Sequence, residues 1–402
     1  MRRKMLEIPL EGLRSPLAPM IAAISILAIL SGATTRALAQ CNWSTKVVTT
    51  LHTDSPPGLT STGDRLILTW GGSSDGAFNS AYSFDGINWT HQVLHTEYPR
   101  ITRKHSGGLG MTYSSACGYV YAGWRDDSNR LWVSRSGPDG ISWQTPRLIL
   151  NPAAPSSAQD IPITNLPCET CCPNCCRGCD PPPPPPPPPG AHGVAMSAPT
   201  LRGDNGALPI GFAVTMPANP IYGSGKFQAF KGKFSCDFSN IVFPSQGSFL
   251  DNGGGDPLLD VAESPVWMGA SGTTKLSAVA TGPPVGFPAM AGQIIYELNN
   301  DFAHSLPEGF WSNNGLAGTV NPNGGAPYLA WTCHSDFGDT CRPDSTGRIN
   351  ILNVITRGHM VCADWSVYNP AMTFFQGKIW VAWRGNESGQ TGYISVASLN
   401  PF

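Results

Sequence analysis

Charged side chains are scarce in this sequence, and neither sign is in excess. Asp, Glu, Lys and Arg together make up 13% of its 402 residues, and the formal net charge is -2. A chain without a basic surface has no electrostatic footprint for nucleic acid, so no nucleic-acid partner is expected. Sparse charge combined with 45 Gly and 38 Pro favours short strands and many turns over helices with charged faces.

Long apolar runs are also missing, apart from one near the start. The run Met20–Leu30 is too short to span a bilayer comfortably, and it lies between the basic residues of Arg2–Lys4 and the small residues of Ala37–Gln40. This order is typical of a secretory signal peptide cleaved after Ala39. We therefore expect removal of residues 1–39, no transmembrane segment in the remainder, and a secreted or periplasmic protein.

A recognisable metal or cofactor motif is absent as well. The chain contains no His-Glu-x-x-His metal helix, for example. No cofactor and no metal centre are predicted.

What the sequence does contain is a repeated β-rich run, in most copies ending in Trp. The copies are anchored at Trp70, Trp124, Val214, Ala280, Trp331 and Trp383. A period near 50 residues, interrupted only by residues 152–196, with about four short strands in each unit, is the signature of propeller blades. We expect an all-β fold over residues 40–402: a six-bladed β-propeller of four-stranded antiparallel blades.

The two ends of this region predict how the ring closes. The last unit stops after a third strand, whereas Cys41–His52 resembles the segment that follows Asp-Gly in complete units. The N-terminal strand can therefore supply the fourth strand of the last blade, which removes the open sheet edge that an unclosed ring would expose.

Two hairpin sequences share the pattern Asp-Gly-Ile-x-Trp. They comprise Asp85, Gly86 and Trp89 in the first unit and Asp139, Gly140 and Trp143 in the second. A carboxylate can accept backbone N–H bonds inside a sharp turn, Gly supplies a positive φ, and Trp buries its ring beside the hairpin.

These hairpins resemble the Asp-box, or BNR repeat, of sialidase-like β-propellers, and the whole repeat region resembles sialidase-like proteins exported by bacteria. In that family the Asp-box hairpins lie on the face opposite the ligand site. The resemblance therefore implies that these Asp, Gly and Trp residues form scaffold and take no part in chemistry.

On the other face we expect the loops after each second strand and between blades. These loops are rich in Arg, Asp and aromatic residues, which suit sugars and carboxylates through bidentate hydrogen bonds and ring stacking. The candidate ligand-binding residues are Arg103, Arg125, Asp126, Arg342, Arg384 and Glu387. Arg125 and Arg384 occupy equivalent positions in their repeats, although a Trp-Arg sequence can also simply end a strand with a solvated charge.

Sialidase activity, if the resemblance extended to chemistry, would require three arginines, a Tyr nucleophile activated by Glu, and an Asp acid/base. The chain lacks the expected Arg-Ile-Pro sequence early in the first unit. Tyr98, Tyr113 and Tyr222 could be matched with Glu97 or Glu263, but no spacing fixes a pair.

An unusual insertion, residues 152–196, interrupts the ring between the second and third units. It holds six cysteines in Cys168–Cys179, followed by Pro181–Pro189. Nine prolines in polyproline II form a stiff spacer about 28 Å long. The cysteines are expected to form local disulfides in an oxidising compartment; a zinc site and intermolecular bridges are the alternatives.

The other six cysteines are scattered. Cys333 and Cys341 flank one short loop and are expected to pair, and Cys41 and Cys362 lie in related sequence contexts at the ring closure. Cys117 is then left to pair with Cys236 by elimination.

Three functions fit this sequence. The leading hypothesis is a propeller that binds glycans, or another cell-surface or extracellular ligand, on its loop-rich face. The second is an exo-glycosidase of the sialidase type with a diverged site. The third is an extracellular assembly protein whose Cys- and Pro-rich insertion docks a protein partner.

Overall fold

The computed structural model is built from strands, turns and connecting segments. It describes residues 39–102, 109–128, 130–150, 194–197, 210–217, 227–242, 267–271, 274–280, 292–298, 304–305, 311–312, 316–321, 325–332, 347–366, 368–386 and 391–402. Within these ranges there is no helix long and apolar enough to cross a membrane.

The first three of six antiparallel sheets follow one another along the chain. Blade 1 consists of β3 (Gly58–Ser61), β4 (Leu66–Gly71), β5 (Phe78–Ser83) and β6 (Thr90–His95). Blade 2 consists of β7 (Gly110–Ser114), β8 (Tyr119–Arg125), β9 (Leu131–Ser136) and β10 (Arg147–Leu150). Blade 3 consists of β11 (Val194–Ser197), β12 (Ile210–Pro217), β13 (Phe227–Phe234) and β14 (Ile241–Val242).

The remaining sheets carry small additions. Blade 4 consists of β15 (Trp267–Ser271), β16 (Thr274–Ala280), β17 (Gly292–Leu298) and β18 (His304–Ser305), with β19 (Trp311–Ser312) also paired to β17. Blade 5 consists of β20 (Leu316–Val320), β21 (Pro327–Thr332), β22 (Gly347–Asn353) and β23 (His359–Ser366), flanked by β1 (Ala39–Gln40). Blade 6 consists of β24 (Ala371–Phe375), β25 (Lys378–Arg384), β26 (Tyr393–Leu399) and β2 (Thr45–His52).

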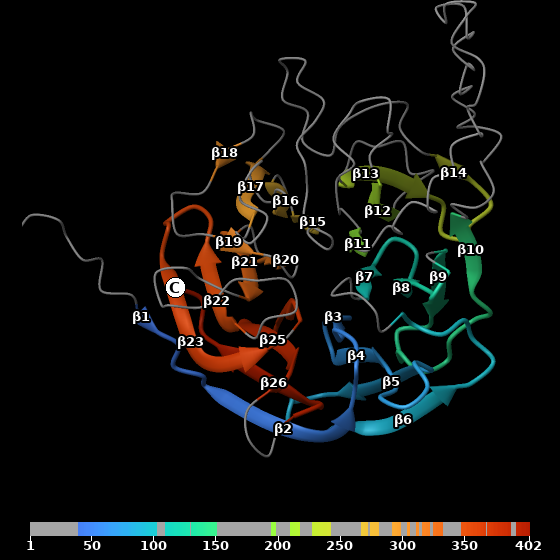
Figure 1. Ribbon diagram of the computed structural model, residues 1–402, viewed down its shortest axis with the longest axis horizontal. Coiled ribbons are helices and arrows are strands. Elements are labelled where there is room, and N and C mark those ends of the chain that lie inside the picture. Colours follow the sequence, from blue (N-terminus) through green and yellow to red (C-terminus); the bar gives the residue numbers. More distant parts are fainter. Residues whose placement is uncertain are drawn as a thin grey trace, which may run out of the picture. The chain divides into compact units, whose positions relative to one another are not determined.

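The innermost strands of the blades close into a ring. Each contacts the innermost strand of the next blade, in the cycle β3, β7, β11, β15, β20, β24 and back to β3 (Figure 1). The chain is therefore a six-bladed β-propeller, as the repeat period predicts, and all six anchoring positions of the repeat lie in second strands. Two strands begin inside ranges that were expected to lie outside the propeller. β1 begins at Ala39, in the range 1–39 expected for the signal peptide, and β11 begins at Val194, in the range 152–196 expected for the insertion.

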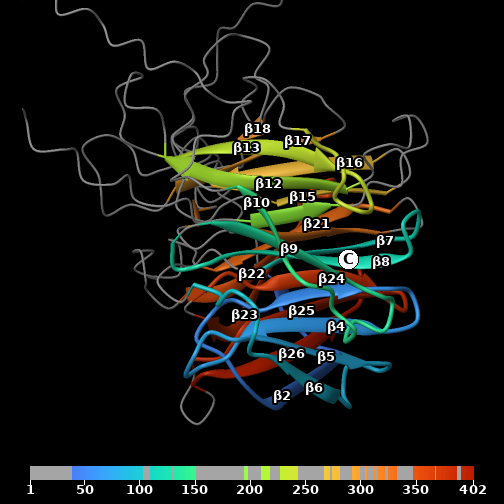
Figure 2. The same ribbon diagram turned by 90° about the vertical axis from the view of Figure 1, so that its right-hand side faces the viewer.

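The N-terminal strand completes blade 6, which confirms the predicted closure. Strand β2 lies antiparallel to β26 (Figure 2). Thr45 of β2 pairs with Ser398 of β26, and Val47 pairs with Val396. Thus β26, the last strand along the chain, is hydrogen-bonded on both sides, and the outer position of blade 6 is occupied.

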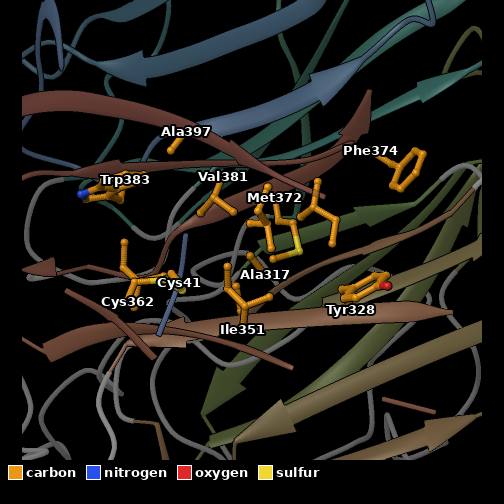
Figure 3. Packing of buried hydrophobic residues seen from close by; sticks show 14 residues of the cluster. Cys41, Ala317, Tyr328, Ile351, Cys362, Met372, Phe374, Val381, Trp383 and Ala397 are labelled. Carbon is orange, nitrogen blue, oxygen red and sulfur yellow. A yellow bond between two sulfur atoms is a disulfide. The ribbon is translucent and has the colours of Figure 1, made fainter. Parts of the chain in front are cut away.

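The hydrophobic core is divided among the interfaces between blades. On β25, Ile379, Val381 and Trp383 pack toward blade 5, in the cluster that Figure 3 shows. The alternate residues Trp380 and Ala382 pack toward blade 1. Successive side chains of a strand point to opposite faces, so an inner strand with a neighbouring blade on each side is apolar at most positions and buries a few polar residues, such as Thr69 of β4.

The two Asp-Gly turns are closed by the carboxylates. Asp85 Oδ1 accepts hydrogen bonds from the backbone N–H groups of Ile87 and Asn88, both at 2.8 Å. Asp139 Oδ1 accepts those of Ile141 at 3.1 Å and Ser142 at 3.2 Å. The Asn88 N–H contributes most to lowering the pKa of Asp85 to about 2.

The glycines of these turns fit against the preceding blade. Gly86 has φ 72° and Gly140 has φ 71°. A Cβ atom on Gly86 would lie 2.0 Å from the Trp380 ring of blade 6, and one on Gly140 would lie 2.6 Å from Ile67 of blade 1. Each of these two turns therefore requires Gly for two reasons: its backbone conformation and the close packing between blades.

A third turn of this kind, in blade 3, was not identified from the sequence. Asp237 Oδ1 accepts the Ser239 N–H at 3.0 Å, and the next residue, Phe238, has φ 62° where the other turns have Gly. Phe238 packs edge-on against Tyr121 of blade 2, with ring centroids 5.9 Å apart. Because both the Gly and the Trp are replaced, only the Ser-x-Asp order remained as a signal.

Within the part of the chain that the structure describes, two disulfides join neighbouring blades, and both pairings match those expected from the sequence. Cys117, in the turn after β7, bonds Cys236, in the turn after β13. Cys41, just before β2, bonds Cys362 of β23. Beside the second bridge, the Asp364 carboxylate accepts a 2.6 Å hydrogen bond from Trp43 Nε1 and pairs with Lys46.

Candidate ligand-binding face

One face of the ring collects the ends of the second strands and the connections between blades. At the end of β8, the Arg125 carbonyl accepts the backbone N–H of Thr102, from the connection between blades 1 and 2. Likewise, isolated antiparallel β-bridges pair the backbone of Ser366 with that of Gly385, and the backbone of Thr53 with that of Gly72. We call this side the loop face and the side with the Asp-Gly turns the turn face.

Arg384 lies on the loop face where blades 5, 6 and 1 meet. Its Nε donates to the Thr53 carbonyl at 2.8 Å, and its Nη2 lies 3.2 Å from Asp54 Oδ1. The guanidinium also lies over the Tyr368 ring, 5.4 Å from its centroid, at a distance that allows a cation–π interaction. Arg384 is thus held on three sides by groups from both adjoining connections.

Asp54 is presented outward by buried neighbours. Thr53 and Ser55 are completely buried, whereas the Asp54 side chain is 37% exposed. The Thr53 hydroxyl lies 2.9 Å from the Gly71 carbonyl, and the Ser55 hydroxyl accepts the Gly71 N–H at 3.1 Å. These buried hydrogen bonds fix the backbone on either side of the exposed carboxylate, so its position is set before any ligand arrives.

A related group of side chains lies at the loop-face end of blade 2. Arg130 Nε donates to Asp126 Oδ2 at 2.7 Å, and the Arg130 guanidinium lies 5.3 Å from the centroid of the Trp132 ring. Asp126 also accepts Trp132 Nε1 at 2.8 Å and the backbone N–H of Ser128 at 2.9 Å. Of the predicted ligand residues, Asp126 is therefore engaged in closing its own turn.

Arg125 occupies the position in β8 that Arg384 occupies in β25, but its surroundings differ. Its side chain is completely buried, and this burial lowers the pKa of its guanidinium to about 9, which still leaves it charged at neutral pH. Arg125 and Arg384 belong to blades 2 and 6, and they contact different connections: the Arg125 carbonyl accepts from Thr102, whereas the Arg384 side chain donates to Thr53. A single clamp formed by both arginines has no support among the described contacts.

The other three predicted ligand residues, Arg103, Arg342 and Glu387, lie outside the described residues, as do the disulfide candidates Cys333 and Cys341. The insertion, apart from Val194–Met196, lies outside them too. Their predicted roles remain predictions.

The candidate Tyr nucleophile Tyr98 is used in packing. Its hydroxyl lies 2.8 Å from the Trp143 carbonyl and 2.9 Å from that of Gln144, and burial raises its pKa to about 12. A hydroxyl with this pKa is a poor nucleophile at neutral pH. Tyr113 lies on the innermost strand β7, whereas Tyr222 and Glu263 are outside the described residues.

Asp54 and Tyr368 are the residues of this face that the sequence did not single out. Each lies in a connection between blades, without a motif of its own. Asp54 approaches Arg384 because the ring closes through β2, and Tyr368 approaches it because the connection from blade 5 leads into β24, beside β25. A sequence signal for them would have required the fold first.

Comparisons with known proteins agree with the fold. No family model matches the chain, and no curated protein matches its sequence. The α-L-arabinofuranosidase Arb93A from Fusarium graminearum, solved with an iminosugar inhibitor, is similar at 10% identity with a TM-score of 0.51, covering 90% of this chain and 98% of that one. The Penicillium chrysogenum α-L-arabinanase bound to arabinobiose is similar at 12% identity with a TM-score of 0.50, covering 90% and 99%.

Looser matches have other activities. A fungal fucose lectin from Aleuria aurantia, itself a six-bladed β-propeller, aligns at 10% identity with a TM-score of 0.45 over 86% of this chain and 96% of that one. Sialidases also occur among the similar structures. At such identities the similarity establishes the fold alone.

Proposed function

We propose that this protein binds glycans on its loop face, through a site formed by Arg384, Asp54 and Tyr368. The observation that carries the proposal is that Arg384 is held from three sides beside an exposed carboxylate and an aromatic ring. Hydrogen-bond donors, acceptors and aromatic surface in fixed positions are what a sugar requires. The proposal replaces the shared Arg125–Arg384 site with one centred on Arg384.

Two structural neighbours with TM-scores of at least 0.5 are carbohydrate-active proteins, one solved with an iminosugar and one with arabinobiose. They support glycans as the ligand class, together with the composition of the loop face. They do not support one sugar over another, because the identities are 10% and 12%.

A glycan array probed with residues 40–402 tests the proposal. We expect retention on a limited set of glycans and at least a tenfold loss of affinity for Arg384→Ala, since hydrogen bonds to a charged group are removed. Arg65→Ala is the matched control, because Arg65 on the turn face also pairs with an aspartate, Asp64, and lies over an aromatic ring. Equal losses in both variants, or no retention on any glycan, would refute the proposal.

The exo-glycosidase is the second candidate, favoured by the α-L-arabinofuranosidase and the α-L-arabinanase among the structural neighbours. The same array distinguishes it, because a hydrolase would remove terminal sugars without stable retention of the protein. The buried hydroxyl of Tyr98 argues against that residue as the nucleophile.

Export to the periplasm or the medium is part of the proposal. The disulfides Cys41–Cys362 and Cys117–Cys236 support it, because disulfides persist in oxidising compartments. Mass spectrometry of the protein from its native host should find Gln40 at the N-terminus. The insertion, residues 152–196, is proposed to dock a protein partner. Because β11 begins at Val194, the test is a deletion that ends before this strand, of residues 152–190, and it should leave glycan binding unchanged.

A further inference from the structure

The contacts of Arg384 also bear on which glycans can bind, if the loop face is a glycan site as proposed. A sugar that carries a carboxylate is bound best by arginines whose charge is not already neutralised. Arg384 does not meet this condition, because Asp54 lies 3.2 Å from its Nη2 and forms an ion pair with it.

From this pairing we infer that the site selects neutral sugars and rejects acidic ones. Asp54 is the more exposed partner, with 37% of its side chain accessible against 15% for Arg384. An acidic ligand that approached Arg384 would therefore meet the carboxylate of Asp54 first, and two like charges at close range repel each other.

A neutral sugar has complementary groups for this arrangement. One hydroxyl can donate to the Asp54 carboxylate, while a neighbouring hydroxyl oxygen accepts from Nη1 of Arg384, which has no hydrogen bond with a described residue. The Tyr368 ring lies beneath the guanidinium and supplies an aromatic surface next to Arg384. Donor and acceptor side by side match a pair of adjacent hydroxyls, whereas a carboxylate offers two acceptors and no donor.

Another loop-face arginine with an aromatic partner, Arg130, repeats the pairing. Arg130 is neutralised by Asp126 at 2.7 Å, and the Trp132 ring lies beneath its guanidinium. In that group the arginine is the exposed member, at 40%, and the aspartate is buried, at 6%. Both of these arginines thus carry a resident counter-ion, and neither is available as a simple carboxylate clamp.

Asp54 is the residue that would set this selectivity, and it can be tested without disturbing Arg384. The probes are arabinobiose, lactose and sialyllactose, titrated calorimetrically against residues 40–402, with Asp54→Asn as the variant. The wild-type protein should bind a neutral probe at least tenfold more tightly than sialyllactose. Asp54→Asn removes the counter-ion and keeps the shape, so it should lower that ratio by about tenfold or more.

Asp54→Glu controls for the charge itself and should restore the preference for neutral sugars. Thermal unfolding of each variant confirms that the connection still folds. Tighter binding of sialyllactose than of lactose by the wild type would overturn this inference and leave glycan binding intact. Binding of none of the probes, together with silence on the glycan array, would overturn the proposed function and this inference with it.

Discussion

Asp85 and Asp139 on the turn face differ from Asp54 on the loop face in the partners of their carboxylates. On the turn face, Asp85 and Asp139 each accept two backbone N–H groups from their own turn. On the loop face, Asp54 is held by its backbone neighbours, and its carboxylate pairs with an arginine that another blade supplies. The carboxylates of Asp85 and Asp139 thus close their own turns, whereas the Asp54 carboxylate joins a connection between blades to Arg384 of β25.

The faces also differ in how close the blades come. The turns of the turn face press glycine backbone against Trp380 and Ile67 of the preceding blade. The loop face joins blades through longer side chains, such as Arg384 reaching Thr53. Changes on the turn face should therefore cost stability, and changes on the loop face should cost binding.

The largest expected effect comes from Gly86→Ala. The new Cβ would lie 2.0 Å from the Trp380 ring at a residue with φ 72°, so we expect a loss of about 3 kcal/mol or more in the free energy of unfolding, or failure to fold. Gly377→Ala is the control, because Gly377 has φ 75° but no atom within 4 Å of its Cβ position. It should cost only about 1 kcal/mol. Similar losses in denaturant titrations would show that packing against blade 6 is unimportant.

Asp85→Ala and Asp54→Ala should separate the two roles. Asp85→Ala leaves two backbone N–H groups without their acceptor, at a cost of about 1–2 kcal/mol in stability, and should not alter glycan binding. Asp54→Ala removes an exposed ion pair, worth below about 1 kcal/mol, and should weaken glycan binding. Paired unfolding and binding measurements on both variants check this, and a reversed pattern would contradict the division between faces.

Acid should act on the turn face through Asp85. Its folded pKa, about 2, is below the usual carboxyl value of 3.8, so its stabilising contribution is complete above the unfolded pKa and is lost as the pH falls through 3.8 toward 2. Asp85→Asn should therefore flatten the fall in unfolding midpoint between pH 4 and about 2, compared with the wild type. An unchanged slope would mean that other carboxylates govern acid unfolding.

The smallest expected effect concerns His95, at the end of β6 where blade 1 leads to the loop face. The ring is mostly buried, stacks on Tyr98 with centroids 4.6 Å apart, and has Glu97 3.6 Å away. Burial lowers its pKa from 6.5, and Glu97 only partly opposes this. Stability should therefore decline as the pH falls below about 6.5, because the unfolded chain takes up the proton more readily.

His95→Phe tests this effect, since Phe keeps an aromatic ring in the same cluster and cannot be protonated. Between pH 7.5 and 5.0 the melting temperature of the variant should fall less than that of the wild type, by roughly 2 °C or more. Equal falls in melting temperature for the variant and the wild type would show that His95 does not contribute to the pH dependence of stability.

The sequence predicted the fold well because the repeat fixes it. Inner strands that are buried on both sides carry mainly apolar side chains. The apolar runs that end in Trp70, Trp124, Trp331 and Trp383 therefore predict four of the six second strands directly. The Asp-Gly turns were identified in blades 1 and 2, where Gly and Trp accompany the Asp. In blade 3, Phe238 takes up positive φ in place of Gly, so the local rule was insufficient.

The candidate site was predicted less well because it is made of residues from different blades. Arg384 was identified from its equivalence to Arg125, but this equivalence in the repeat did not reveal that one side chain is buried and the other lies beside an exposed carboxylate. The approach of Asp54 to Arg384 depends on ring closure between β2 and β26. The sequence predicted that closure, but no pattern in it showed that the connection after β2 would bring Asp54 to Arg384.

The closure of the ring also has a consequence for synthesis on the ribosome. Thr45 pairs with Ser398, so β2 emerges among the first strands and must wait for almost the whole chain before its partner exists. Contacts this distant in sequence form late and slowly. Cys41 must wait as well, since Cys362 lies 321 residues away, whereas Cys117 and Cys236 are separated by only 119. If cysteines were oxidised before Cys362 had been made, Cys41 would pair with other cysteines. The timing of thiol exchange, more than the strength of any single contact, should therefore govern the yield of closed rings.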